Sequence, residues 1–228
     1  YIKFFDSLNK LNINYSSIFY NFKSMNEINY LKEFNINFNN VKRLTLKIRN
    51  NYKKKDNNDN IKNFFEILFS FNNIENKLIY LDIDMNFKYY EINNELLFEN
   101  INNLKLLKYL YIKNLKFNKG FIIKLNELKL LSIISCKNIK LSEISNEKLR
   151  ELYLLENKIS SINILEKVNF KEINKLDLSY NKISNIKKLQ KVNFKELKEL
   201  NLSCNEISDI NILEKVNFKE IKKLNLRC

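Results

Sequence analysis

The C-terminal third of this 228-residue chain repeats one pattern at a constant step of 24 residues. Three segments align without a gap, beginning at Leu149 (LRELYLLENKI), Ile173 (INKLDLSYNKI) and Leu197 (LKELNLSCNEI). A fourth begins at Ile221, and the intervening text KVNFKE recurs at the same step. Because a unit of this length cannot bury its own apolar side chains, neighbouring units must stack on one another. The repeat therefore predicts a solenoid.

Each unit predicts a short strand followed by a bend and a helical turn. In the shared pattern LxxLxLxxNxI, the second and third leucines, such as Leu176 and Leu178, are two residues apart, which places both on one face of a strand. Further along, Leu165 and Val168 and their equivalents have the i, i+3 spacing of a helical turn. The Phe that follows, such as Phe170, is expected to fill the core between adjacent coils.

The pattern LxxLxLxxNxI resembles the leucine-rich repeat family, and the 24-residue units resemble its short, phosphatase-regulator-like subclass. The resemblance implies an α/β solenoid, a right-handed superhelix with a concave parallel β-sheet and a helical or irregular convex side. It also implies that the Asn of each unit joins a ladder of hydrogen bonds to the backbone of neighbouring coils, and that Cys can replace it. The ladder residues would be Cys136, Asn157, Asn181 and Asn205. The subclass implies binding to another protein.

Towards the N-terminus the pattern persists at longer and uneven steps. Residues 61–71 are the best helix candidate, because their apolar side chains fall at i, i+3, i+4 and i+7, whereas 53–60 hold no apolar residue and predict a flexible insertion. We predict about nine strands in a single domain over residues 1–228, with irregular repeats in 1–127 and regular repeats in 128–228. Before the three aligned segments, the inward pairs are expected at Leu131 and Ile133, Leu110 and Ile112, Leu81 and Ile83, Leu44 and Leu46, and Leu11 and Ile13.

Both ends of the chain interrupt the pattern. The chain begins at Tyr1 without an initiator Met, and its last unit stops at Cys228, directly after the inward Leu224 and Leu226. Because solenoids normally cap such ends, we expect a fragment of a longer protein. The open C-terminal end is expected to contact further repeats or another subunit.

The composition argues against catalysis. With no His and a single Gly, the chain holds no Ser–His or Cys–His nucleophilic pair and no glycine-rich phosphate loop. It also lacks CxxC and HExxH motifs. The acidic pair Asp82 and Asp84 is expected to be solvated or to face a partner. We expect no enzymatic activity, no cofactor and no bound metal.

Cysteine content and charge indicate a compartment and raise a question about partners. Three cysteines are too few and too scattered for a disulfide framework or a zinc site, which favours an intracellular, cytoplasmic location. No apolar run is long enough to predict a membrane span. The net charge is +14, and nearly all of the excess comes from Lys. Two interpretations stay open: a solvated surface shaped by A/T-rich codons, and a site for nucleic acid or another polyanion.

Residues between the inward leucines should point out of the sheet, so its exposed columns can be listed from the sequence. Aromatic and aliphatic residues gather in the middle of these columns, with charge on both sides, as in protein-binding surfaces. The patch consists of Tyr80, Tyr109, Tyr111, Leu130, Ile134, Tyr153 and Leu155. The alternative is that biased codons scatter such residues without a role, or that other segments cover them.

These features together predict a non-enzymatic protein–protein interaction module or scaffold that binds a protein partner on its concave face. The rival hypothesis is a basic subunit of a larger assembly that binds nucleic acid or an anionic surface. The two differ in salt dependence, because phosphate binding by counterion release weakens steeply as salt rises.

Overall fold

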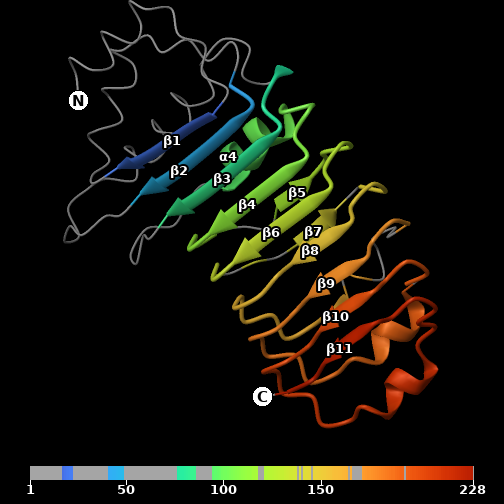
Figure 1. Ribbon diagram of the computed structural model, residues 1–228. Coiled ribbons are helices and arrows are strands. Elements are labelled where there is room, and N and C mark those ends of the chain that lie inside the picture. The colour runs from blue at the N-terminus through green and yellow to red at the C-terminus, as the bar shows by residue number, and fades with distance from the viewer. Residues whose placement is uncertain are drawn as a thin grey trace, which may run out of the picture.

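The computed structural model describes residues 17–22, 41–48, 76–85, 94–117, 121–137, 139, 141–144, 146–163, 165, 171–192 and 194–227. Within these residues, nine parallel strands form one open sheet in chain order, with β1 and β11 at opposite ends (Figure 1). This arrangement is a solenoid-like α/β fold, and the parallel sheet that the repeat predicts is confirmed. The strands are β1 (Ser17–Phe22), β2 (Arg43–Ile48), β3 (Tyr80–Met85), β4 (Tyr109–Lys113), β6 (Leu130–Ile134), β8 (Glu151–Tyr153), β9 (Lys175–Asp177), β10 (Glu199–Asn201) and β11 (Lys223–Asn225).

The register of the sheet places the repeated leucines in one column. Leu152, Leu176, Leu200 and Leu224 are successive partners at the 24-residue step. The column continues through the irregular units, although their steps differ, and its members there are Leu131, Leu110, Leu81 and Leu44. All of them are at most 1% exposed except Leu224, at 44%. The apolar core therefore lies directly under the sheet and runs from Val41, before β2, to Val216, between β10 and β11.

A second layer covers the buried side of the sheet, and Figure 1 shows α4 (Asn94–Asn102), β5 (Phe121–Ile123) and β7 (Leu141–Ile144) behind the large strands. In α4, the side chains of Leu97, Phe98 and Ile101 lie on one face and are buried. The ring centroid of Phe98 lies 5.9 Å from that of Phe117. Helix α4 thus closes the core within the 29-residue step from Leu78 to Leu107.

The C-terminal coils carry short helical turns on this side, as the i, i+3 spacing predicts. They are the 3₁₀ helices η4 (Lys187–Lys191) and η5 (Asn211–Lys215). Phe194 follows η4, is fully buried, and stacks on Phe218 of the next coil with ring centroids 6.0 Å apart. The expectation that this Phe fills the core between coils is confirmed at Phe194.

The structure corrects two expectations about local structure. Strands β5 and β7 pair with each other in a parallel two-stranded sheet, so the side expected to be helical or irregular also contains β-structure. Beside Leu44 and Leu46, the register partners are Ile18 and Tyr20 of β1, and not Leu11 and Ile13. Strand β1 lacks the leucine pattern and is instead rich in aromatic residues, which also favour strands. Residues 8–13, 53–60 and 61–71 lie outside the described part of the chain.

After each of the strands β8, β9 and β10, an Asn side chain bonds to the backbone of a neighbouring coil. The Oδ1 of Asn181 accepts hydrogen bonds from the N–H groups of Asn157 and Ile159, both at 3.0 Å. Its Nδ2 donates to the carbonyl oxygens of Leu154 at 2.8 Å and Leu178 at 2.9 Å. One buried side chain thereby satisfies backbone groups of two coils that would otherwise lack partners.

The same position in the other coils is less uniform. Asn205 repeats the arrangement, and Asn157 Oδ1 accepts a hydrogen bond from the Cys136 N–H at 2.8 Å. Cys136 offers only a thiol, whose Sγ lies 3.4 Å from the Leu115 nitrogen. At Leu115 the position is apolar and fully buried. The hydrogen bonding is thus stronger at Asn157, Asn181 and Asn205 than at Cys136 and Leu115.

The residue before each of these positions has left-handed backbone geometry. The five residues are Asn114, Ser135, Glu156, Tyr180 and Cys204, with φ between 52° and 61°. A residue with a Cβ adopts this geometry at a cost of about 1–2 kcal/mol. The corner is therefore fixed by the fold, since it recurs without a single glycine.

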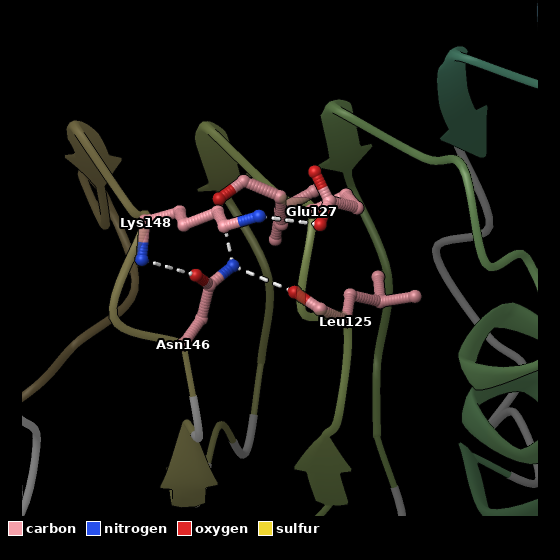
Figure 2. Close-up of polar contacts among 5 residues, drawn as sticks. Leu125, Glu127, Asn146 and Lys148 are labelled. Carbon is pink, nitrogen blue, oxygen red and sulfur yellow. Dashed lines mark hydrogen bonds and ion pairs between the residues drawn. The ribbon is translucent and has the colours of Figure 1, made fainter.

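Asn146 is a polar residue in an otherwise apolar column, and sequence analysis missed it. Its equivalents three residues before the first leucine of a unit include Leu104, Leu125 and Phe194, which are all buried. As Figure 2 shows, Asn146 Nδ2 donates to the Leu125 carbonyl oxygen at 2.6 Å, and its Oδ1 accepts from the Lys148 N–H at 2.7 Å. Asn146 thereby ties the coil that leads to β6 to the next coil.

Candidate functional site

The outward side of the large sheet, called here the strand face, carries rows of side chains that the register aligns across the coils. Its first row contains Arg43, Tyr80, Tyr109, Leu130, Glu151, Lys175, Glu199 and Lys223. Its second row contains Thr45, Asp82, Tyr111, Ser132, Tyr153, Asp177, Asn201 and Asn225. These rows alternate with the buried leucines, as period-2 spacing requires.

Three of the expected residues meet on strands β3 and β4. The ring centroid of Tyr80 lies 5.2 Å from that of Tyr111 and 6.4 Å from that of Tyr109, and both pairs are tilted. Tyr109 is 37% exposed, while Tyr80 and Tyr111 are half-buried. Tilted rings at these distances attract one another beyond their shared burial. Tyr80, Tyr109 and Tyr111 are called the tyrosine cluster below.

Two resident cations lie on the rings of the tyrosine cluster. The guanidinium carbon of Arg43 is 4.4 Å from the centroid of Tyr80, and Lys113 Nζ is 5.8 Å from that of Tyr111. Burial raises the pKa of both Tyr80 and Tyr111, so their hydroxyl groups stay protonated at neutral pH. The cluster therefore offers neutral aromatic surface and hydroxyl donors.

The remaining expected residues contribute less surface. Leu130 follows Tyr109 in the first row but is only 9% exposed, so the expectation of an exposed Leu130 needs correction. It lies between Tyr109 and Glu151, whose larger side chains flank it. Ile134 and Leu155 are half-buried on the neighbouring coils. They extend the apolar area without projecting from it.

Tyr153 lies apart from the tyrosine cluster. In the second row it is separated from Tyr111 by Ser132, which is buried. Its hydroxyl donates a hydrogen bond to Glu151 Oε2 at 2.7 Å on the same strand. Burial, and then this hydrogen bond, raise the pKa of Tyr153. Tyr153 is thus held in place by its own strand.

Asp82 is the one charged residue among the described residues that is buried, at 8% exposure. It lies between Thr45 and Tyr111 in the second row. The nearest cation, Lys113 Nζ, is 4.0 Å from Asp82 Oδ1, which is too long for a hydrogen bond. In the described part of the chain, no other buried side-chain oxygen or nitrogen lacks a hydrogen-bond partner. Burial raises the pKa of Asp82, and the Lys113 ammonium opposes that rise.

The C-terminal part of the strand face satisfies its own polar groups. Glu199 carboxylate oxygens lie 3.8 Å from Lys175 Nζ and 3.1 Å from Lys223 Nζ. Asp177 accepts hydrogen bonds from the Ser179 N–H at 2.9 Å and from Asn201 Nδ2 at 3.0 Å. This part is a network of mutual charge and hydrogen-bond partners.

Cys136, which is expected to be structural, has an unreactive thiol. Burial raises the pKa of the Cys136 thiol to about 12, so it stays protonated at neutral pH. A protonated, buried thiol is a poor nucleophile and a poor metal ligand. No group of three or more His, Cys, Asp or Glu side chains in the described residues is placed to hold a metal ion.

No helix in the described part of the chain has the length and apolar character needed to cross a bilayer.

Comparison with known proteins gives no match, either among protein-family models or among curated sequences.

Proposed function

We propose that this chain is a leucine-rich repeat protein that binds another protein through its strand face and catalyses no reaction. In this proposal the strand face is the concave side of a right-handed superhelix, and the 24-residue units belong to the short, phosphatase-regulator-like type. The in-order parallel sheet, the column of buried leucines and the Asn hydrogen bonds between coils support the assignment.

The observation that carries the binding proposal is the tyrosine cluster. Three aromatic rings lie together on the outward side of a sheet whose buried side already has a complete apolar core. Tyrosines at the centre of an interface are frequent anchors, because a rigid ring buries much area at little entropic cost. The neighbouring charges, Arg43 and Lys113, supply a polar margin.

A capture experiment with matched variants tests the proposal. Proteins retained by the immobilised chain are identified, and the candidate partner is purified and titrated against three forms of the chain. Replacing Tyr80, Tyr109 and Tyr111 with Ala is expected to weaken binding at least about 100-fold, the effect of losing two or three anchor residues. Replacing Lys175, Glu199 and Lys223 with Ala, on the same face, is expected to change it less than about fivefold.

Circular dichroism and the urea midpoint establish that each variant is folded. Tyr109→Lys provides a second variant, because Tyr109 is the most exposed ring and its replacement disturbs the core least. Undiminished binding by a folded triple variant, or by Tyr109→Lys at an interface centred on this ring, would contradict the proposal.

A polyanion-binding function is the rival that the net charge of +14 favours. Exposed lysines follow η4 and η5 at equivalent positions, such as Lys195 and Lys219, but Glu196 and Glu220 come directly after them. This alternation reduces the local positive field. Binding of a labelled single-stranded RNA that is tight at 50 mM salt and weakens by about 10³-fold at 200 mM would favour the rival.

A further inference from the structure

Asp82 differs from every other carboxylate described on the strand face. Asp84 Oδ1 accepts a hydrogen bond from Asn114 Nδ2 at 2.6 Å, and Asp177 accepts several. Glu151 is bonded to Tyr153, and Glu199 is paired with two lysines. Asp82 alone is buried, charged and left with an oxygen that accepts no hydrogen bond. An unsatisfied buried acceptor costs about 1–3 kcal/mol, so its persistence calls for a compensating role.

From this contrast we infer that Asp82 and the tyrosine cluster receive an arginine side chain of the protein partner. The inference rests on the proposed function, because it names what the partner presents to the same face. A guanidinium supplies the N–H donor that Asp82 Oδ1 lacks and a charge opposite to that of the carboxylate. Its planar faces also stack on tyrosine rings while its edge donates.

The geometry around Asp82 matches this ligand. Asp82 pairs directly with Tyr111 across strands β3 and β4, and Tyr80 precedes it by two residues on the same face. Asp82 Oδ1 is covered in the free chain, so the side chains around it must move aside for a guanidinium to reach it. The two rings, 5.2 Å apart, then offer aromatic surface beside the carboxylate. Arg43, 4.4 Å from the Tyr80 centroid, shows that a guanidinium stacks on this cluster.

The resident cations do not take this position. Arg43 lies over the Tyr80 ring in the first row, one strand away from Asp82, and its charge and hydrogen bond oppose the rise that burial gives to the pKa of the Tyr80 hydroxyl. Lys113 remains 4.0 Å from Asp82 Oδ1 and gives charge compensation without a hydrogen bond. The charge of Lys47 also acts on Asp82. All three cations would repel an incoming arginine, so the tyrosine rings and the Asp82 carboxylate must together outweigh them.

A titration with small probes tests the inference without any partner protein. Nα-acetyl-arginine methylamide and its neutral isostere, Nα-acetyl-citrulline methylamide, are titrated against the isotope-labelled chain by NMR. The arginine probe is expected to shift the backbone amides of Leu81, Asp82 and Ile83 in a saturable manner. The citrulline probe should bind at least about tenfold more weakly, since it keeps the shape but loses the charge.

Variants locate the binding on Asp82. Asp82→Asn removes the charge with nearly the same shape and is expected to weaken the arginine probe at least about tenfold. Asp84→Asn, two residues along the same strand face, is the matched control and should keep binding within about twofold. The spectrum of each variant reports whether it is folded, and the comparison of the two probes on the unmodified chain needs no variant.

The outcomes separate this inference from the proposed function. Equal shifts with arginine and citrulline, no shift at Leu81–Ile83 with either, or unchanged binding by Asp82→Asn would overturn the arginine site. If those results accompany partner binding that still depends on the tyrosine cluster, the binding face stands and its arginine specificity falls. If arginine binds at Asp82 while the folded triple tyrosine variant still captures the partner, the proposed function falls instead.

Discussion

Neighbouring coils are held together by different interactions in the middle of the sheet and at its C-terminal end. Strands β3, β4 and β6 have five or six residues, whereas β8 to β11 have three each. Strands β8, β9 and β10 are followed by Asn residues that bond to neighbouring coils, whereas β4 and β6 are followed by Leu115 and Cys136. Longer strand pairing thus replaces side-chain bonding in the middle coils.

The two regions also differ in what their outward surfaces leave available. The C-terminal rows pair lysine with glutamate and asparagine with aspartate. The middle rows expose tyrosines and bury a carboxylate with an unused oxygen. Exposed aromatic residues and buried polar groups without partners cost stability, and such residues tend to mark functional sites in proteins. The irregular region is therefore where we expect recognition, and the regular region supplies support.

The largest predicted difference concerns the position after each strand. Asn181→Ala leaves several buried backbone groups without partners, and we expect a loss of about 3–5 kcal/mol in the free energy of unfolding. Cys136→Ala removes a thiol that accepts from the Leu115 N–H and donates only weakly to the Ile112 and Ile134 carbonyl oxygens, and it removes little volume, so about 1–2 kcal/mol is expected. Urea unfolding at pH 7 measures both. Equal losses would show that the two regions do not differ in this respect.

The junction between the regions gives the next prediction. Asn146→Leu restores the apolar character of its column but removes the donor to the Leu125 and Leu128 carbonyl oxygens. We expect a net loss of about 1–3 kcal/mol, because unpaired buried carbonyls outweigh the added apolar contact. The exposed Asn163→Ala is the control and should stay within about 0.5 kcal/mol. A higher free energy of unfolding for Asn146→Leu would mean that the Asn146 hydrogen bonds do not stabilise the fold.

Asp82 gives a pH-dependent prediction. Since the folded state raises its pKa above the ordinary 3.8, the proton on Asp82 stabilises the fold at acid pH. That contribution is lost as pH rises through the raised value. Asp82→Asn cannot ionise, so its urea midpoint should exceed that of the unmodified chain at pH 7. The difference should shrink as pH falls towards 3.8. A midpoint lower than the unmodified chain at pH 7 would show that the Asp82 charge is satisfied in the fold.

The smallest effect is expected on the C-terminal strand face. Lys223→Ala breaks the 3.1 Å ion pair with Glu199, but the lysine is mostly exposed. Exposed ion pairs contribute about 0.2–1 kcal/mol, and Lys175 still faces Glu199 after the change. Thermal unfolding at low and high salt should therefore differ little from that of the unmodified chain. A loss comparable to that of Asn146→Leu would reverse our ranking of the two regions.

Much of the core could be predicted, because the leucine spacing states which side chains face inward. Leu81, Ile83, Leu110 and Ile112 are all fully buried although their units depart from the 24-residue step. The second layer could not be predicted so well. Strands β5 and β7 depend on pairing between coils, and no short-range pattern in Phe121–Ile123 or Leu141–Ile144 encodes that pairing.

The candidate site could be predicted only in part, because the sequence does not show which outward residues are buried by their neighbours. Period-2 spacing placed Tyr80, Tyr109 and Tyr111 on one face, and the register brings their rings together. The spacing treats every outward residue as exposed, however, so it could not distinguish buried Leu130 from exposed Tyr109. The same limit concealed Asp82, whose burial depends on side chains from the neighbouring strands. Burial on the outward face is a tertiary property.

The exposed Leu224 has a consequence for how the molecule comes apart. Each strand of the large sheet pairs only with the next coil on either side, so stability passes along the array between nearest neighbours. Strand β11 has a neighbouring strand on one side only. Its Leu224 is 44% exposed, whereas the equivalent leucines of the other coils are buried. Within the given 228 residues, fraying from this end starts at β11 and advances coil by coil towards β4. In hydrogen exchange, this gives a gradient of protection that rises from the C-terminal coil towards the tyrosines.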